Sequence, residues 1–330
     1  VFTYLIRGIL IGISSGVVLL LLQTPIFWLA LKLFQAVPEV EAQAQTYLSI
    51  RIWSAPLSIS NYAMLGWLIA LEKTVYVLYL QILVNVLNII LDMIFVLYLG
   101  WGIEGVAFAS LIAEVVGSFF ALILAIKLYR KSGSPIISNL FSILKWKRLF
   151  YNNLNILIRS ILLEIVVLSY VFFGSIQGTV MLATNHILLQ FVHISSYSLD
   201  GFAFSAEALV GSAYGQQSRS KIRTAAIKST IWALTCAMCL TLLFFIFGEN
   251  LIAIMVRDEG VQNSAEKYFF WMAITPLTGV PSFMLDGIFI GAAKTQLMRK
   301  AMIQSFVVYF ISVSMLLPIF GNYGLWICIN

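Results

Sequence analysis

Charged residues are scarce in this chain. Lys, Arg, Asp and Glu together make up only 10% of its 330 residues, whereas 61% of the residues are hydrophobic. A soluble domain carries about 25% charged residues, so this composition excludes an ordinary soluble domain and indicates an integral membrane protein. The net charge of +6 does not indicate nucleic-acid binding, because most Lys and Arg residues lie in short segments between apolar runs, where they set membrane orientation.

Segments of strictly alternating hydrophobicity are also absent, which excludes an outer-membrane barrel. Helices are then the remaining way to satisfy the backbone within lipid, so we predict an all-α polytopic membrane protein. Cysteine is rare as well: Cys236, Cys239 and Cys328 lie in apolar runs with no further Cys or His nearby. This setting favours buried apolar side chains over a metal site or a redox pair.

Apolar runs bounded by turn and charge signals predict nine membrane-spanning segments and the start of a tenth near Leu325. A bilayer span needs roughly 20 apolar residues. The predicted segments are 8–34, 48–71, 76–98, 104–126, 150–173, 184–212, 224–247, 268–290 and 301–319.

The connection between 126 and 150 is the longest hydrophilic one and holds six Lys and Arg residues. It divides the chain into residues 1–130, a linker at 131–149, and residues 150–330. If the segments alternate in direction, this connection and the other basic ones, around Lys73, Arg219 and Lys294, fall on one side. The positive-inside rule places that side in the cytoplasm.

Two parts of the chain resemble each other at a constant offset in the numbering, which pairs Gly66 with Gly287. Residues 66–70 precede Lys73-Thr74 in the same way that residues 287–291 precede Lys294-Thr295. The offset covers six predicted helices, an even number, so both copies run in the same direction through the membrane. We therefore predict two six-helix lobes related by a pseudo-twofold axis along the membrane normal. On this interpretation the first two helices of one lobe and most of the last helix of the other are missing from this sequence.

A polar stripe runs along one face of the predicted helix 76–98. Its members follow one another at spacings of 4, 3 and 4 residues, which stacks them on a single helix face. A carboxylate within a membrane costs about 2.5–3.5 kcal/mol on insertion scales, so it usually serves a function. For the amides the alternative is a network of hydrogen bonds between helices. The stripe consists of Gln81, Asn85, Asn88 and Asp92.

Two hydroxyl groups are expected at the depth of Asp92: Ser110 in the next helix and Tyr47 in an earlier one. Together with the Asn88 amide, they predict a small all-oxygen site for a proton or for a hard cation such as Na⁺. No other metal site and no cofactor is predicted.

A second stripe lies on the predicted helix 184–212, again on one face. Asp200 lies near the middle of this span and is a candidate to titrate or to meet a cationic substrate. The members of this second stripe are His186, Gln190, His193, Tyr197, Asp200 and Glu207. Glu207 has about the predicted depth of Arg159 on the neighbouring helix, so we predict a structural ion pair between these two side chains.

Three stretches of the sequence resemble the multidrug and toxic compound extrusion (MATE) family, and most of all its DNA-damage-inducible (DinF-like) branch. They are Tyr47-Leu48-x-Ile50-Arg51, the Asn85-x-x-Asn88-x-x-x-Asp92 pattern followed by a glycine-rich turn at 100–105, and the run from Leu199 to Leu209. The run at 285–291 also matches that branch.

The resemblance implies a secondary active antiporter, not an enzyme, that exports amphipathic or cationic drugs and metabolites in exchange for H⁺ or Na⁺. It implies a cation site at Tyr47, Asn88, Asp92 and Ser110, with Ser110 in place of a frequent Thr. The residues expected along the substrate pathway are Asn85, Gln190, His193, Tyr197 and Asp200. The partners implied are small organic substrates and the bilayer, with no nucleic acid.

The location implied is the inner membrane of a bacterium, with an organellar membrane as the alternative, and the oligomeric state implied is a monomer. A flippase for lipid-linked oligosaccharides, from the same superfamily, is the alternative function. Such a flippase would favour a strongly cationic cavity, whereas the charges in the predicted spans are mainly acidic.

Overall fold

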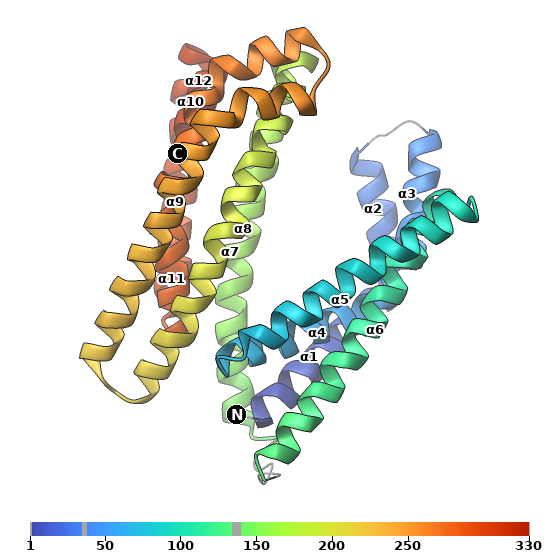
Figure 1. Ribbon diagram of the computed structural model, residues 1–330, viewed down its shortest axis with the longest axis vertical. Helices are drawn as coiled ribbons and strands as arrows, with labels where there is room; N and C mark the ends of the chain where they lie inside the picture. Colours follow the sequence, from blue (N-terminus) through green and yellow to red (C-terminus); the bar gives the residue numbers. More distant parts are fainter. Residues whose placement is uncertain (1, 35–37, 134–139, 330) are drawn as a thin grey trace. The chain divides into compact units, whose positions relative to one another are not determined.

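The computed structural model describes residues 2–34, 38–133 and 140–329, and these residues form helices joined by short turns (Figure 1). The chain divides into two compact units, Val1–Ser142 and Ile143–Asn330. The division falls within the predicted linker 131–149, of which residues 134–139 lie outside the described residues.

The first unit differs from the predicted spans at two places. The predicted segment 8–34 is interrupted by a turn at Leu22, and the predicted segment 48–71 contains a short 3₁₀ stretch between two helices. A π-helical stretch, in which each turn is wider than in an α-helix, continues α5. The elements are α1 (Phe2–Leu21), α2 (Gln23–Phe34), α3 (Pro38–Arg51), η1 (Ile52–Ser54), α4 (Ala55–Ala70), α5 (Thr74–Asp92), the π-helical η2 (Met93–Tyr98) and α6 (Gly102–Lys131).

Small residues let helices of the first unit approach closely. A Cβ on Gly16 of α1 would lie 2.3 Å from the Cα of Pro56 in α4, and one on Gly12 would lie 2.7 Å from the backbone of Ser60. On the other side of this unit, a Cβ on Gly117 of α6 would lie 2.3 Å from a methyl group of α5. Close backbone approach of this kind is how helices associate within lipid, where no hydrophobic force drives them together.

The helices of the second unit begin earlier than predicted, by nine residues in α10 and by five in α9. The first turns of α9 and α10 are polar, so the apolar runs in the sequence do not include them. Ser218 caps α9 and Asp258 caps α10 through their side chains. The elements are α7 (Ile143–Ile176), α8 (Thr179–Gly215), α9 (Arg219–Met255), α10 (Glu259–Gly291), α11 (Thr295–Phe320) and α12 (Asn322–Ile329).

Helix α10 packs along α8, again through glycines. A Cβ on Gly287 would lie 2.3 Å from the carbonyl oxygen of Ala203, and one on Gly291 would lie 2.5 Å from that of Glu207. These two contacts fix the register of α10 on α8, because they place Gly287 beside Ala203 and Gly291 beside Glu207.

Seven helical segments of the described residues are long and apolar enough to cross a membrane, which makes the chain a polytopic α-helical membrane protein. Helix α8 is not one of them although it has 37 residues, because the polar stripe predicted on it lowers its hydropathy. The seven are Phe2–Leu21, Thr74–Tyr98, Gly102–Lys131, Ile143–Ile176, Arg219–Met255, Glu259–Gly291 and Thr295–Phe320.

The turn between α4 and α5 and the turn between α10 and α11 have the same backbone geometry. Glu72 has a φ of 57° and Ala293 a φ of 53°, although neither is glycine. The following residues, Lys73 and Lys294, both donate a backbone hydrogen bond to a carbonyl five residues earlier, at 2.9 and 2.8 Å. Both pairs are separated by the offset that relates Gly66 to Gly287, as the predicted repeat requires. The turn at Gln217, between α8 and α9, has the same geometry.

A further pair of positions fixes the alignment beyond this turn. Gly100 and Gly321, which are separated by the same offset, both have positive φ, and each lies at or just beyond the end of a repeated helix. The stretch from Thr74 to Gly100 therefore aligns with that from Thr295 to Gly321 without insertion. Helix α5 with its π-helical continuation corresponds to α11.

Candidate functional site

The polar stripe of α5 has no counterpart in the repeat. Asn88 and Asp92 correspond to Tyr309 and Val313 of α11, whose side chains are only 6% and 1% exposed in the core of the second unit. The same helix of the repeat therefore packs with aromatic and aliphatic residues at these positions. Helix packing alone does not require an amide and a carboxylate there, which argues for a function of the stripe.

Asn88 bonds directly to the neighbouring helix. Its Nδ2 donates a hydrogen bond to the Oγ of Ser110 in α6, at 3.2 Å. Asp92 follows Asn88 by one helical turn on the same face. The Oδ1 atom of Asp92 is buried and has no hydrogen-bond partner within the described part of the chain.

An unpartnered carboxylate oxygen is costly in a membrane unless it takes up a proton or a cation. The site contains the carboxylate of Asp92, the amide of Asn88 and the hydroxyl of Ser110. Oxygen atoms of these groups are suitable ligands for a hard cation. Asp92 also marks the point where α5 changes to the π-helix Met93–Tyr98. Such π-helical insertions are frequent at functional sites, and the corresponding part of α11 remains α-helical.

Tyr47 contacts a different group of side chains, a cluster that the sequence did not predict. The Tyr47 hydroxyl interacts with the guanidinium of Arg51, and Arg51 forms an ion pair with Glu114 of α6 at 2.7 Å. Ser58 of α4 donates a hydrogen bond to the other oxygen of Glu114, and Arg51 also donates to Ser54 at 3.3 Å. This cluster ties α3, α4 and α6 together.

Helix α6 contributes a side chain to each of the two groups. Ser110 bonds to α5, whereas Glu114, one turn further along, bonds to α3 and α4. Residues four apart lie on the same face of a helix. The pair Asn88–Ser110 and the pair Arg51–Glu114 are therefore neighbouring polar contacts along α6.

In the second unit, the predicted ion pair between Arg159 and Glu207 is wrong. Arg159 of α7 instead pairs with Asp286 of α10, and Asp200 of α8 lies close enough to interact with Arg159 electrostatically. Glu207 makes no ion pair with the described residues.

The reason is the register of α7 and α8. The two helices meet at the turn between Ile176 and Thr179. At 1.5 Å per residue, Arg159 lies about 25 Å from that turn and Glu207 about 42 Å. Asp200 lies about 31 Å from it, within reach of the long Arg side chain, and Asp286 directly precedes the Gly287 that contacts α8 beside Ala203.

The other residues of the second stripe differ in burial. Gln190 and Asp200 are half-buried, whereas His186 and His193 are exposed and Tyr197 is 74% exposed. The rings of His193 and Tyr197 stack, with centroids 6.3 Å apart. In the first unit, Asn85 is exposed too.

A buried hydrogen-bond network centred on Asn185 was also not predicted. Asn185 and Asn322 exchange two amide hydrogen bonds, at 2.8 and 2.9 Å. The Oδ1 of Asn185 additionally accepts from Trp326 at 3.2 Å and from Tyr170 at 3.4 Å. All four side chains are almost inaccessible, so this network serves to join α12 to α7 and α8.

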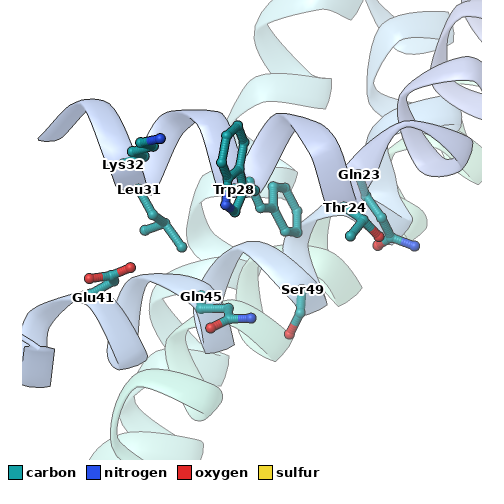
Figure 2. A pocket seen from close by; sticks show the side chains of 9 residues that line it. Gln23, Thr24, Trp28, Leu31, Lys32, Glu41, Gln45 and Ser49 are labelled. Atoms are coloured by element: carbon teal, nitrogen blue, oxygen red, sulfur yellow. The ribbon is translucent and has the colours of Figure 1, made fainter. Parts of the chain in front are cut away.

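A groove of about 680 Å³ lies between α2 and α3, and Figure 2 shows its lining from both helices. Lys32 lies 4.7 Å from the ring centroid of Trp28, so this aromatic face already carries a cation. The groove contains none of the predicted site residues. No group of three or more His, Cys, Asp or Glu side chains in the described ranges is arranged to hold a metal ion.

The family model described as MatE matches residues 1–94 and 155–316. The chain belongs to the MatE family. This membership confirms the resemblance drawn from the sequence stretches at 47–51, 85–105, 199–209 and 285–291, and solved structures of MATE transporters share the fold.

Among MatE relatives, the DNA damage-inducible protein F of Escherichia coli is 31% identical over 99% of this chain and 71% of its own length. Protein DETOXIFICATION 43 of Arabidopsis thaliana is 26% identical over 87% of this chain and 54% of its own length. The chain thus spans about half the length of the plant relatives it matches.

Solved transporter structures share the fold of this chain. The Vibrio cholerae MATE transporter VcmN superposes with a TM-score of 0.86 over 98% of this chain and 73% of its own, at 18% identity. A MOP superfamily transporter from Pyrococcus furiosus superposes with a TM-score of 0.84 over 99% of this chain and 74% of its own, at 17% identity.

Proposed function

We propose that this protein is a secondary active antiporter that exports amphipathic or cationic organic compounds in exchange for H⁺ or Na⁺. Membership of the MatE family supports transport, and the DETOXIFICATION names of the plant relatives support substrates of a toxic or foreign kind. On this proposal the protein carries out no catalysis and needs no cofactor besides the coupling ion. We place it in the inner membrane of a bacterium, as a monomer.

The observation that carries the proposal is the buried, unpartnered oxygen of Asp92 beside the Asn88–Ser110 hydrogen bond. A carboxylate in this position is stable when a proton or Na⁺ neutralises it and is costly when it is bare. Its affinity for the ion is therefore coupled to any rearrangement of α5 and α6 that changes how much water reaches it.

The coupling ion enters from outside the cell in this mechanism. In the outward-open state Asp92 takes up H⁺ or Na⁺, its charge is neutralised, and a cationic substrate held nearby is released. The loaded protein then returns to the inward-open state and gives the ion up to the cytoplasm. Each charge that crosses the membrane contributes about 2.3 kcal/mol per 100 mV of membrane potential.

The substrate pathway that we propose includes Asn85 in the first unit and Gln190, His193, Tyr197 and Asp200 in the second. The exposed, stacked rings of His193 and Tyr197 provide an apolar and polarisable surface for an amphipathic compound. The half-buried carboxylate of Asp200 provides attraction for a cation.

Two contacts weigh against a flippase for anionic lipid-linked sugars. A pyrophosphate group needs unpaired cations, but Arg51 is paired with Glu114 and Arg159 with Asp286. Neither guanidinium is available without first breaking its ion pair.

The test is uptake of a fluorescent organic cation by liposomes that contain the full-length protein, driven by an imposed H⁺ gradient or, separately, an imposed Na⁺ gradient. We expect Asp92→Asn to lower gradient-driven uptake by at least about tenfold, because the amide cannot carry a proton or an equivalent charge. Glu104→Gln, which removes an exposed carboxylate from the start of α6, is the matched control and should leave uptake unchanged. Uptake by Asp92→Asn at the wild-type rate would overturn the proposed role.

A further inference from the structure

The first two turns of α7, Ile143–Tyr151, carry a patch of exposed cations mixed with exposed apolar side chains. Lys145, Lys147 and Arg148 are exposed. Ile143 is 83% exposed and Leu144 is 82% exposed. No residue of α7 before Asn155 is buried, so this part of the helix does not serve the core of the second unit.

The charge of this region is uniform. From Glu114 to Glu164 the sequence contains no other acidic residue, and it contains seven Lys and Arg residues in between. None of Lys145, Lys147 and Arg148 forms an ion pair with the described residues. The counter-charge for these three cations must therefore come from outside the described chain.

The length of α7 places the patch at the edge of a bilayer. Its 34 residues span about 51 Å at 1.5 Å per residue, whereas the hydrocarbon core is about 30 Å thick. The predicted span 150–173 is the part suited to that core. The first turns then extend into the headgroup layer, where Trp146 and Tyr151 are residue types typical of the interface.

The arrangement of the side chains also fits this layer. At 100° per residue, Lys145, Lys147 and Arg148 point to different sides of the helix, with Ile143 and Leu144 between them. A helix that passes upright through the headgroups meets phosphate groups on several sides, so that cations on different sides of it can each reach a phosphate.

We propose that Ile143–Tyr151 is a binding site for anionic phospholipids, through contacts of Lys145, Lys147 and Arg148 with the headgroup phosphates. Clusters of Lys and Arg directly beside a membrane span attract anionic lipid, by about fivefold in affinity for each cation. This proposal is independent of the substrate and of the coupling ion.

The experiment uses the full-length protein in nanodiscs that contain photoactivatable phosphatidylglycerol or phosphatidylcholine with the same acyl chains, and maps the adducts by mass spectrometry. We expect adducts on Ile143–Tyr151 to be at least about tenfold more abundant with phosphatidylglycerol, from the combined effect of three cations. Equal adduct yields with the two lipids would overturn the proposal, and this comparison needs no variant.

Two variants test which residues are responsible. The triple variant K145Q/K147Q/R148Q should lower the phosphatidylglycerol adducts on this segment to the phosphatidylcholine level. The control R219Q/K221Q/R223Q removes the same charge from the start of α9, where no strongly exposed apolar side chain lies between the cations, and should leave the adducts on Ile143–Tyr151 unchanged. An equal loss in both variants would mean that only the overall charge matters, which contradicts a site on α7.

Discussion

Glu72 and Ala293, at equivalent positions of the repeat, hold their backbones in the same left-handed conformation, with φ values of 57° and 53°. Their amides also make equivalent hydrogen bonds, to Ile69 at 2.8 Å and to Ile290 at 2.9 Å. Left-handed backbone is unfavourable for residues that carry a Cβ. Both copies of the repeat therefore retain the same strained turn before the helix that follows.

Glycine should relieve this strain. We expect Glu72→Gly and Ala293→Gly each to raise the free energy of unfolding by about 0.5–1 kcal/mol, since glycine adopts positive φ at little cost. The measurement is thermal unfolding of the purified protein in detergent. Gly100→Ala, at a φ of 70° with open space around the new Cβ, should have the opposite effect, and stabilisation by it would contradict this explanation.

Ser110 should contribute to ion coupling through its hydroxyl group. Ser110→Ala removes the acceptor of the Asn88 hydrogen bond. It should raise the half-saturating concentration of the coupling ion severalfold. Ser110→Thr retains the hydroxyl and should transport at close to the wild-type rate. The half-saturating concentration of the coupling ion, measured in liposomes for each variant, distinguishes these outcomes; equal values for Ala and Thr would remove Ser110 from the site.

Substitutions of Arg159 and of Asp286 should have non-additive effects on the free energy of unfolding, because the two side chains form an ion pair. Arg159→Leu leaves two carboxylates, Asp286 and Asp200, without their cation, and should lower the free energy of unfolding by about 1–3 kcal/mol. Adding Asp286→Leu should restore part of the loss, and a double-mutant cycle measures the coupling. Glu207→Gln is the control for the pairing predicted from sequence and should change stability by less than about 0.5 kcal/mol.

Equivalent glycines of the two units should differ in their tolerance of a methyl group. A Cβ on Gly287 would collide with the backbone oxygen of Ala203 at 2.3 Å, whereas one on Gly66 meets nothing within 4 Å. Gly287→Ala should therefore destabilise the protein by about 1–3 kcal/mol. Gly66→Ala should stabilise it by up to about 1 kcal/mol, because alanine favours a helix interior over glycine. Thermal unfolding of the two variants side by side is the measurement.

Asn185 should be the most sensitive of the buried polar residues. Asn185→Leu leaves Asn322 and Trp326 with unsatisfied groups in a closed interior, and should lower the free energy of unfolding by about 2–4 kcal/mol. The double variant Asn185→Leu/Asn322→Leu removes both amides and should be less damaging than the sum of the single changes. Additive losses would show that the two amides act independently.

Much of the fold followed from the sequence because it depends on local patterns. Apolar runs located the helices, and the turn residues Lys73-Thr74 and Lys294-Thr295 located the repeat. The π-helix after Asp92 was not found, because it lies inside a continuous apolar run that gives no turn signal. The break at Leu22 was missed although Gln23, Thr24 and Pro25, which follow it, interrupt the apolar run.

Contacts between helices were harder to predict, because they depend on where each helix begins. Arg159 was assigned to Glu207 instead of Asp286 because the depth of both residues was judged from approximate helix ends and not from the turn that joins α7 to α8. The Arg51–Glu114 pair was missed for a related reason. Each residue is visible in the sequence, but their separation of 63 positions gives no indication that they meet. By contrast, Asn88 and Ser110 lie in consecutive helices at similar distances from one short turn, so their proximity was predictable.

Helix α8 has a consequence for experiments on topology. It is long enough to cross the bilayer but too polar to be selected by hydropathy. A topology drawn from hydropathy alone would omit it, would join α7 directly to α9 and would place both ends of α8 on the same side of the membrane. Reporter fusions placed before and after α8 should give opposite signals. The polar residues that lower the hydropathy of α8 are therefore the ones to consider first when labelling sites are chosen.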